Sequence, residues 1–279
     1  MTDEAPAQPE PSKKWLLSAL CLSGGVLPVA ARWLPGDFLR LSYGLLIAFI
    51  FLIAAALLGK SVNLRRLRLL LLAIFTFSLI QILNNFLPGY ALTHILHETA
   101  TAGNPLASTL SASVVIQLLE TSIALIPIFI LNRASGEHPG AIYAQKGKIG
   151  RWVIFAILAF LVFYLITFRV TARHWFPING SMTVGRYLSL TPPLLLMVLT
   201  NGLQEEFLFR ALFLRKYTAL LGPHTANLIQ AIVFTIAHVG VTYTPNALLF
   251  LIVFVFPLGL FMGYLMRRTD SVIAPVIFH

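Results

Sequence analysis

The residues best suited to chemistry are two adjacent glutamates, Glu205 and Glu206, followed by Arg210, all within an apolar stretch. In a helix Glu206 and Arg210 are four residues apart, so they share one face and can form an ion pair. Glu205 is rotated by about 100° from Glu206 and is not positioned to share that pair fully. One carboxylate is therefore neutralised, and the other is left free in a low-dielectric site, where it suits a general base or acid.

Two histidines further along the chain can join this cluster. The next apolar stretch holds Phe234-x-x-x-His238, a spacing that puts both rings on one helix face, where Phe234 can support the imidazole. The last residue, His279, ends a short apolar piece. At about 1.5 Å per helical residue, Glu205, His238 and His279 each lie roughly 13–21 Å from a polar flanking segment on the same side. Three titratable groups at one depth can form a single site.

The elements that must position these residues are transmembrane helices. Of 279 residues, 58% are hydrophobic and only 11% are charged, with a mean hydropathy of +0.84, whereas a soluble domain is about 25% charged. A spanning helix needs about 20 apolar residues, and lipid offers backbone groups no partner outside a helix. We predict an all-α, polytopic bundle of about eight spanning helices. The expected spans are 15–31, 41–59, 69–87, 114–131, 152–170, 192–214, 226–241 and 247–266.

The chain is predicted to form one membrane domain behind a polar tail. Residues 1–14 are rich in Pro and acidic residues and are expected to be a disordered cytoplasmic tail. Residues 15–279 form the predicted transmembrane domain, with the motif-bearing core at 192–279. Most of the 20 Lys and Arg fall between spans on the side of the tail, which predicts a cytoplasmic N-terminus. This topology explains the formal charge of +10, and no motif for reading nucleic-acid bases is present.

A structural role for buried polar residues is the simpler alternative. Polar side chains join transmembrane helices through hydrogen bonds, and we assign that role to Glu120, which is alone in its span. A charge inside a span costs at least about 2.5 kcal/mol, so a cluster of charges usually marks a functional site. The cluster around Glu205 therefore favours function over packing.

These residues resemble the motifs of the CPBP family of intramembrane proteases, which includes the CAAX prenyl endopeptidases and the bacteriocin-processing and immunity proteins. The family motifs are E-E-x-x-x-R, F-x-x-x-H and a late H-x-x-x-N or H-x-x-x-D. Here residues 205–210 read EEFLFR, residues 234–238 read FTIAH, and only His279 represents the third motif. The resemblance covers about 192–279, and the earlier spans match only as hydrophobic helices.

The resemblance implies hydrolysis of a peptide bond in a membrane-associated protein or peptide. By this resemblance Glu205 activates water with help from His238, and His279 helps to stabilise the oxyanion. Glu206 and Arg210 act as a supporting pair. We expect no metal, because a Glu–His pair suffices for base catalysis. A zinc site built from His238, His279 and one glutamate is the alternative.

Two other functions fit the same cluster. A non-catalytic membrane immunity or scaffold protein of this family would retain it, and a proton-coupled transporter would use Glu205 and His238 as a relay. Inverted repeats, which many transporters contain, are not visible in the sequence. We therefore predict an endopeptidase in a bacterial cytoplasmic membrane. Because the third family motif extends four residues beyond His279, we also expect a truncated chain or an impaired enzyme.

Overall fold

The computed structural model describes residues 11–59, 61, 64–98, 109–148, 150–170, 184–240 and 247–279. In these ranges the chain forms helices, turns and bends without any strand, which confirms the all-α prediction. The longer helices are α1 (Pro11–Ala30), α2 (Asp37–Leu57), α3 (Arg65–Tyr90), α4 (Leu110–Ala134), α5 (Gly150–Val170), α7 (Val184–Glu205), α9 (Pro223–Ala237) and α11 (Phe256–Thr269). The short ones are η1 (Ala31–Trp33), η2 (Ala91–Ile95), η3 (Pro139–Ile142), η4 (Glu206–Ala211), α8 (Leu214–Leu221), α10 (Ala247–Phe250), η5 (Leu251–Val255) and α12 (Ile273–Phe278).

Each of the eight expected spans overlaps a helix, although in the span expected over 226–241 the helix ends at Ala237. Among the described residues, five helical segments are long and apolar enough to cross a membrane. These five are Lys13–Trp33, Asp37–Leu57, Arg65–Ile95, Leu110–Ala134 and Leu248–Thr269. The three other expected spans correspond to α5, α7 and α9. Helix α5 has a shorter apolar stretch at Gly150–Val162. Helix α7 carries the polar residues of the site, and α9 has only 15 residues. The chain is thus an integral membrane protein.

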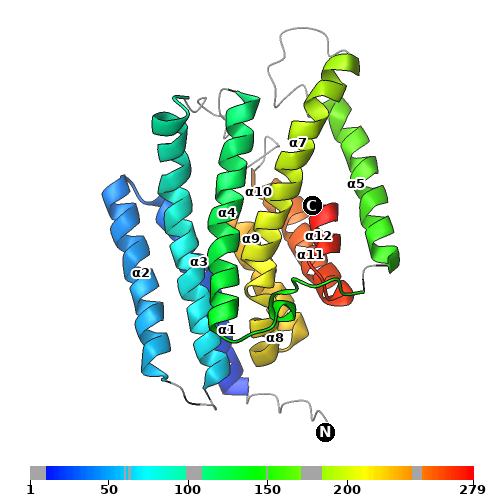
Figure 1. Ribbon diagram of the computed structural model, residues 1–279. Coiled ribbons are helices and arrows are strands. Elements are labelled where there is room, and N and C mark those ends of the chain that lie inside the picture. The colour runs from blue at the N-terminus through cyan, green and yellow to red at the C-terminus, as the bar shows by residue number, and fades with distance from the viewer. Residues whose placement is uncertain are drawn as a thin grey trace.

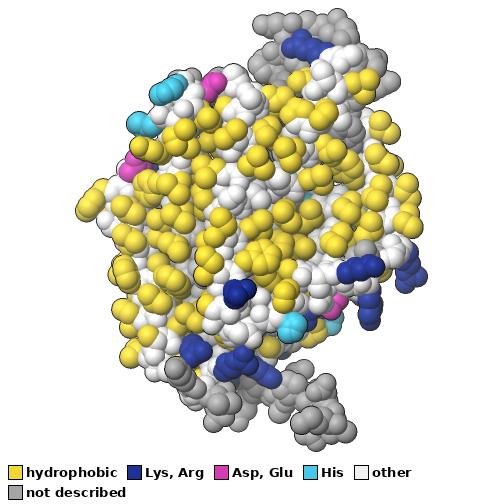
Figure 2. Space-filling view, in the orientation of Figure 1, with side chains coloured by type: hydrophobic (Ala, Val, Ile, Leu, Met, Phe, Trp, Pro, Cys, Tyr) yellow, Lys and Arg dark blue, Asp and Glu magenta, His cyan; other side chains and the backbone are white. Residues whose placement is uncertain are grey.

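The helices form a bundle with a lipid-facing apolar surface. In Figure 1, α2, α3 and α4 stand side by side, α7 crosses beside α4, and α5 forms the opposite edge against α12. Figure 2 shows hydrophobic side chains across the visible face, and most of its Lys and Arg side chains along the lower end. That end holds the start of α3 and the helix α8, whereas the C-terminus lies at mid-height inside the bundle.

Adjacent glycines bring α1 against the helices of the site. A Cβ at Gly24 would lie 2.4 Å from Ile74 Cδ1, and one at Gly25 would lie 2.4 Å from Val233 Cγ2. Small residues allow such close approach between membrane helices. As a result α1 packs on both α3 and α9, and Arg32 in η1, directly after α1, reaches the end of α9.

Several helix boundaries differ by a few residues from the sequence expectation, and two of these differences concern the tail and the site. Helix α1 begins at Pro11, within the segment expected to be a disordered tail, because proline is well accommodated in a first helical turn. Residues 1–10 lie outside the described residues. The single helix expected over 192–214 instead begins at Val184, and from Glu206 it continues as the π-helix η4.

Candidate active site

The glutamate pair lies where α7 changes from α-helix to π-helix. Helix α7 ends at Glu205, and η4 covers Glu206–Ala211. The amide of Leu212 donates to the carbonyl of Phe207, five residues earlier, at 3.0 Å. All six residues of η4 are buried. π-Helical turns are rare overall, but many of those that occur lie at functional sites, because the wider turn changes the direction of the side chains.

Glu206 and Arg210 form the ion pair that their spacing predicts. Arg210 Nη1 donates to Glu206 Oε1 at 2.6 Å, and both side chains are 0% exposed. The guanidinium carbon of Arg210 also lies 4.4 Å from the centroid of the Phe234 ring, so the aromatic face partly replaces the water that a cation would otherwise bind. This ion pair has no access to solvent, so its role is to support the site structurally.

His238 ends α9 with its ring held in one tautomer. Its centroid lies 4.3 Å from that of Phe234, so the two rings pack as their spacing indicates. His238 Nδ1 lies 2.8 Å from the Phe234 carbonyl oxygen. A carbonyl can only accept, so Nδ1 carries the hydrogen. In the neutral ring Nε2 is then the unprotonated nitrogen, and it lies 3.7 Å from Glu205 Oε2.

His279 links the two glutamates. Its Nδ1 lies 3.0 Å from Glu206 Oε1, and its Nε2 lies 3.3 Å from Glu205 Oε2. The structure therefore brings together Glu205, His238 and His279 from three segments that are distant in sequence. The side chain of Glu205 is 18% exposed, against 0% for Glu206. Of the two carboxylates, Glu205 is the one that water or a substrate can reach.

Glu205 has a neighbour on its own helix that the sequence reasoning did not single out. Asn201 Nδ2 donates to Glu205 Oε1 at 3.3 Å. The spacing of four residues on one helix face was the available signal. Next to them, Gln204 accepts a hydrogen bond of 2.7 Å from Gln117 on α4. Asn201 thus orients Glu205, whose Oε2 is buried between the two imidazoles with no hydrogen bond from a described residue.

A tight contact between α7 and α12 sets the position of His279. A Cβ at Gly202 would lie 3.1 Å from His279 Cβ and 3.2 Å from the Val276 carbonyl oxygen. Glycine therefore allows α12 to lie directly on α7, one turn before Glu205. On the other side of α12, Phe278 stacks on Phe155 of α5, with 6.4 Å between the ring centroids.

The start of α12 is fixed by the segment that connects α4 and α5. Asp270 adopts a left-handed backbone conformation with φ of 53°. Its carboxylate accepts hydrogen bonds from Gln145 Nε2, at 2.6 Å, and from Arg215. Ser271 Oγ donates to the Gln145 carbonyl at 2.6 Å, and the amide of Val272 donates to the Tyr143 carbonyl at 3.1 Å. Four separate bonds thus fix the turn that leads into α12, and His279 lies at the other end of that helix.

The two histidines of the site present their Nε2 atoms toward Glu205. Within the described residues no group of three or more His, Cys, Asp and Glu side chains is arranged to hold a metal ion. Nδ1 of His238 is bonded to a carbonyl and Nδ1 of His279 to Glu206, so Nε2 is the ring nitrogen of each that remains to act at Glu205. The chemistry available to the protein groups is proton transfer between an accessible carboxylate and two imidazoles.

Comparison with known proteins supports the resemblance that the sequence motifs indicate. No curated protein and no solved structure matches the chain. A family model described as type II CAAX prenyl endopeptidase Rce1-like matches residues 187–279. This segment contains Glu205, His238, His279 and the Glu206–Arg210 pair. The resemblance to the CAAX-type intramembrane protease family is therefore confirmed for the part of the chain that builds the site.

Proposed function

We propose that this protein is an intramembrane endopeptidase that hydrolyses a peptide bond of a membrane-associated protein or peptide. The observation that carries the proposal is the position of Glu205 Oε2, 3.3 Å from His279 Nε2 and 3.7 Å from His238 Nε2, on the carboxylate whose side chain is 18% exposed. The match of residues 187–279 to a protease family supports it.

Glu205 acts in this proposal as the general base. Glu205 Oε2 and His238 Nε2 both present lone pairs at 3.7 Å, so a water molecule that donates to both would relieve their repulsion. Glu205 removes a proton from this water while the water oxygen attacks the scissile carbonyl carbon and forms the new C–O bond. The same proton passes to the leaving amide nitrogen, directly or through His238, when the C–N bond breaks. No net proton is consumed.

His279 acts as the oxyanion donor. Its Nδ1 is within hydrogen-bond distance of Glu206 Oε1, which also accepts from Arg210. With His279 protonated, its positive charge and that of Arg210 would together balance the negative charges of Glu205 and Glu206. The His279 Nε2–H, 3.3 Å from Glu205 Oε2, lies beside the base and in this proposal turns to the carbonyl oxygen as negative charge develops there. Such donors contribute about 10²–10³ in rate.

The N-terminus is proposed to lie in the cytoplasm of a bacterial cell. Support comes from the Lys and Arg side chains at one end of the bundle in Figure 2, since such loops stay on the cytoplasmic side. A reporter fused after Arg66 should give a cytoplasmic signal, and one fused after Thr109 a signal from the opposite side. Signals in the reverse pattern would contradict the orientation.

The test of the function is a search for cleaved partners in cells. Membrane proteins from cells that express the wild-type chain are compared with those from cells that express Glu205→Gln, and new peptide termini are identified by mass spectrometry. The proposal expects termini that appear only with the wild type. Purified protein should then cleave that partner in the presence of a strong chelator. Inhibition by chelator with recovery on adding zinc would contradict the metal-free mechanism.

Enlarging Gly202 is expected to misplace His279. A Gly202→Leu side chain would meet the α12 backbone and push His279 away from Glu205. A displacement of about 1 Å can lower a rate by roughly 10²-fold, so we expect a loss of that order. Gly185→Leu is the matched control, because a Cβ at Gly185 on the same helix would meet nothing within 4 Å. Equal cleavage rates for the two variants would show that the position of His279 is unimportant.

A further inference from the structure

A cavity at the basic end of the bundle lies apart from the glutamate site. It has a volume of about 260 Å³ and lies between the start of α3, the segment after α4, and α8. Four cations line it: Arg65, Arg66, Arg215 and Lys216. Glu137 is the one acid in the lining.

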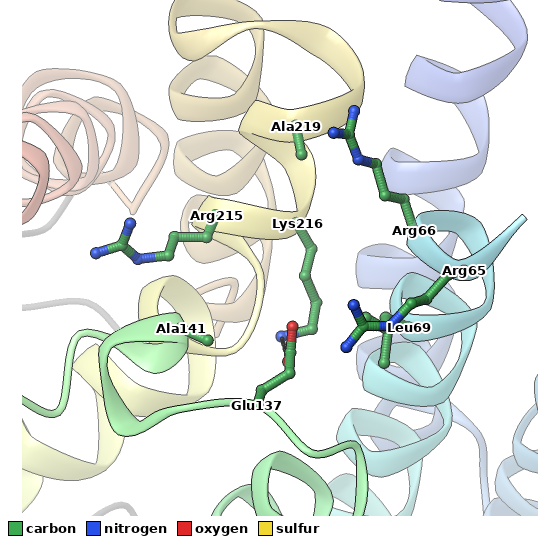
Figure 3. A pocket seen from close by; sticks show the side chains of 8 residues that line it. All are labelled: Arg65, Arg66, Leu69, Glu137, Ala141, Arg215, Lys216 and Ala219. Atoms are coloured by element: carbon green, nitrogen blue, oxygen red, sulfur yellow. Dashed lines mark ion pairs between the residues drawn. The ribbon is translucent and has the colours of Figure 1, made fainter. Parts of the chain in front are cut away.

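The cavity is a built site and not only a set of loop charges. The Lys216 side chain is 8% exposed and lies 3.4 Å from the Glu137 carboxylate. Burial lowers the pKa of Lys216, and the nearby carboxylate opposes this shift. Positive charge in loops is sufficient for membrane orientation, so orientation alone does not require a lysine that is almost completely buried. Figure 3 shows Lys216 and Arg65 directed toward Glu137, whereas Arg215 points away from it.

Positive charge in the cavity exceeds negative charge. Glu137 pairs with Lys216, and Arg215 pairs with Asp270 outside the lining. No described residue forms an ion pair or hydrogen bond with the side chain of Arg65 or Arg66. Both lie in the first turn of α3, which has no acidic residue and no side-chain cap. The helix dipole makes this position unfavourable for cations and favourable for an anion.

We propose that this cavity binds the phosphate group of an anionic membrane lipid. Arginine favours phosphate because its planar donors can make two parallel bonds to one group. The cavity lies at the end of the bundle, where lipid headgroups are located, and basic pockets between membrane helices suit such headgroups. Its volume is adequate for a phosphate and too small for a large ligand. The proposal does not depend on proteolytic activity.

The test measures lipid binding by the purified full chain in nanodiscs of neutral phosphatidylcholine, with and without phosphatidic acid. Native mass spectrometry should detect retained phosphatidic acid on the wild type. An Arg65→Gln/Arg66→Gln variant should bind it at least about tenfold more weakly, because two charge-assisted contacts are lost. Arg133→Gln/Arg151→Gln removes the same charge from exposed residues at the same end that do not line the cavity, and should leave binding unchanged.

Two results would overturn the proposal. Equal loss of phosphatidic acid in both double variants would mean that general positive charge attracts the lipid and the cavity does not. Competition by millimolar inorganic phosphate at an affinity equal to that of the lipid would identify free phosphate as the ligand. Thermal unfolding of each variant in neutral nanodiscs verifies that the fold is retained.

A separate observation concerns Arg32, which lies in η1, outside the matched residues 187–279. Its Nη2 donates to the Val239 carbonyl at 3.0 Å and also to the Ala237 carbonyl. These two carbonyls flank His238, where α9 ends. A cation that binds the last carbonyls of a helix satisfies acceptors that have no partner within it. We infer that Arg32 is a positioning residue that holds the backbone on both sides of His238.

This inference rests on the proposed function, since its readout is cleavage. Arg32→Gln should lower kcat by about tenfold and leave KM within twofold, because His238 is moved while substrate contacts are kept. Arg32→Lys should restore part of kcat. Arg40→Gln is the control, because Arg40 is close to Arg32 in the sequence but donates to Leu34 and Asp37 instead of to the carbonyls beside His238. A wild-type kcat in Arg32→Gln, with Glu205→Gln inactive, would reject only the role of Arg32. Absence of cleavage by the wild type would reject the function itself.

Discussion

Replacing Glu205 with glutamine is expected to slow cleavage by about 10²–10⁴-fold, the range contributed by a positioned general base, while the protein accumulates as the wild type does. The amide has nearly the shape of the carboxylate and can keep the contact with Asn201 through its oxygen. It cannot accept a proton from water. The measurement is the single-turnover rate of cleavage of an identified substrate, with protein amount determined from the purified membrane fraction.

Two comparisons make this result specific. Glu205→Asp keeps the charge but withdraws the carboxylate by one methylene from the two imidazoles, so we expect a rate between those of the wild type and Glu205→Gln. Glu98→Gln makes the same chemical change at a residue that binds Thr109 outside the site and should leave the rate unchanged. A rate for Glu205→Gln within tenfold of the wild type would assign the base to another group and remove the central element of the mechanism.

Replacing Arg210 with alanine is expected to prevent accumulation of folded protein. Glu206 would then be a fully buried carboxylate that has lost its ion-pair partner. Breaking a buried pair in this way costs about 3–5 kcal/mol, which is a large share of a total stability of about 5–15 kcal/mol. The loss of the cation above Phe234 would add to this. Size-exclusion profiles and thermal unfolding of detergent-purified protein measure the effect.

A double variant separates folding from catalysis. In Glu206→Gln/Arg210→Met neither partner leaves an unpaired charge, so accumulation should recover. Cleavage should stay low, because His279 loses the carboxylate that holds its Nδ1. Arg40→Ala removes one member of an exposed pair with Asp37 and should change stability little. Normal accumulation of Arg210→Ala without activity would instead make Arg210 a direct participant in the reaction.

The charged residues and histidines that meet in the site could be predicted from the sequence. Charged residues inside apolar stretches indicated Glu205, Glu206 and Arg210, because burial of charge needs a reason. Helical spacing predicted the pairing of Glu206 with Arg210 and the packing of Phe234 on His238. A simple count of depth placed His279 near Glu205, and the two side chains lie in contact.

Other features of the site left no pattern in the sequence. The π-helical turn at Glu206–Ala211 depends on packing around η4, and no local propensity announces it. The partners of Arg32 are backbone carbonyls, which every residue has. The turn at Asp270 is held by residues more than 50 positions away in the chain, such as Arg215 and Gln145. Such contacts depend on the tertiary fold, and one sequence alone does not define them.

The ion pair within η4 also affects how the chain enters the bilayer during synthesis. A charged residue near the centre of a membrane helix adds about 2.5–3.5 kcal/mol to its insertion. Glu206 and Arg210 lie four residues apart on one segment, so they can neutralise each other before α9 and α12 are made. The pair would then enter as a polar unit of no net charge. In this order of events, biogenesis produces a preformed acceptor, and His279 binds to it when α12 arrives.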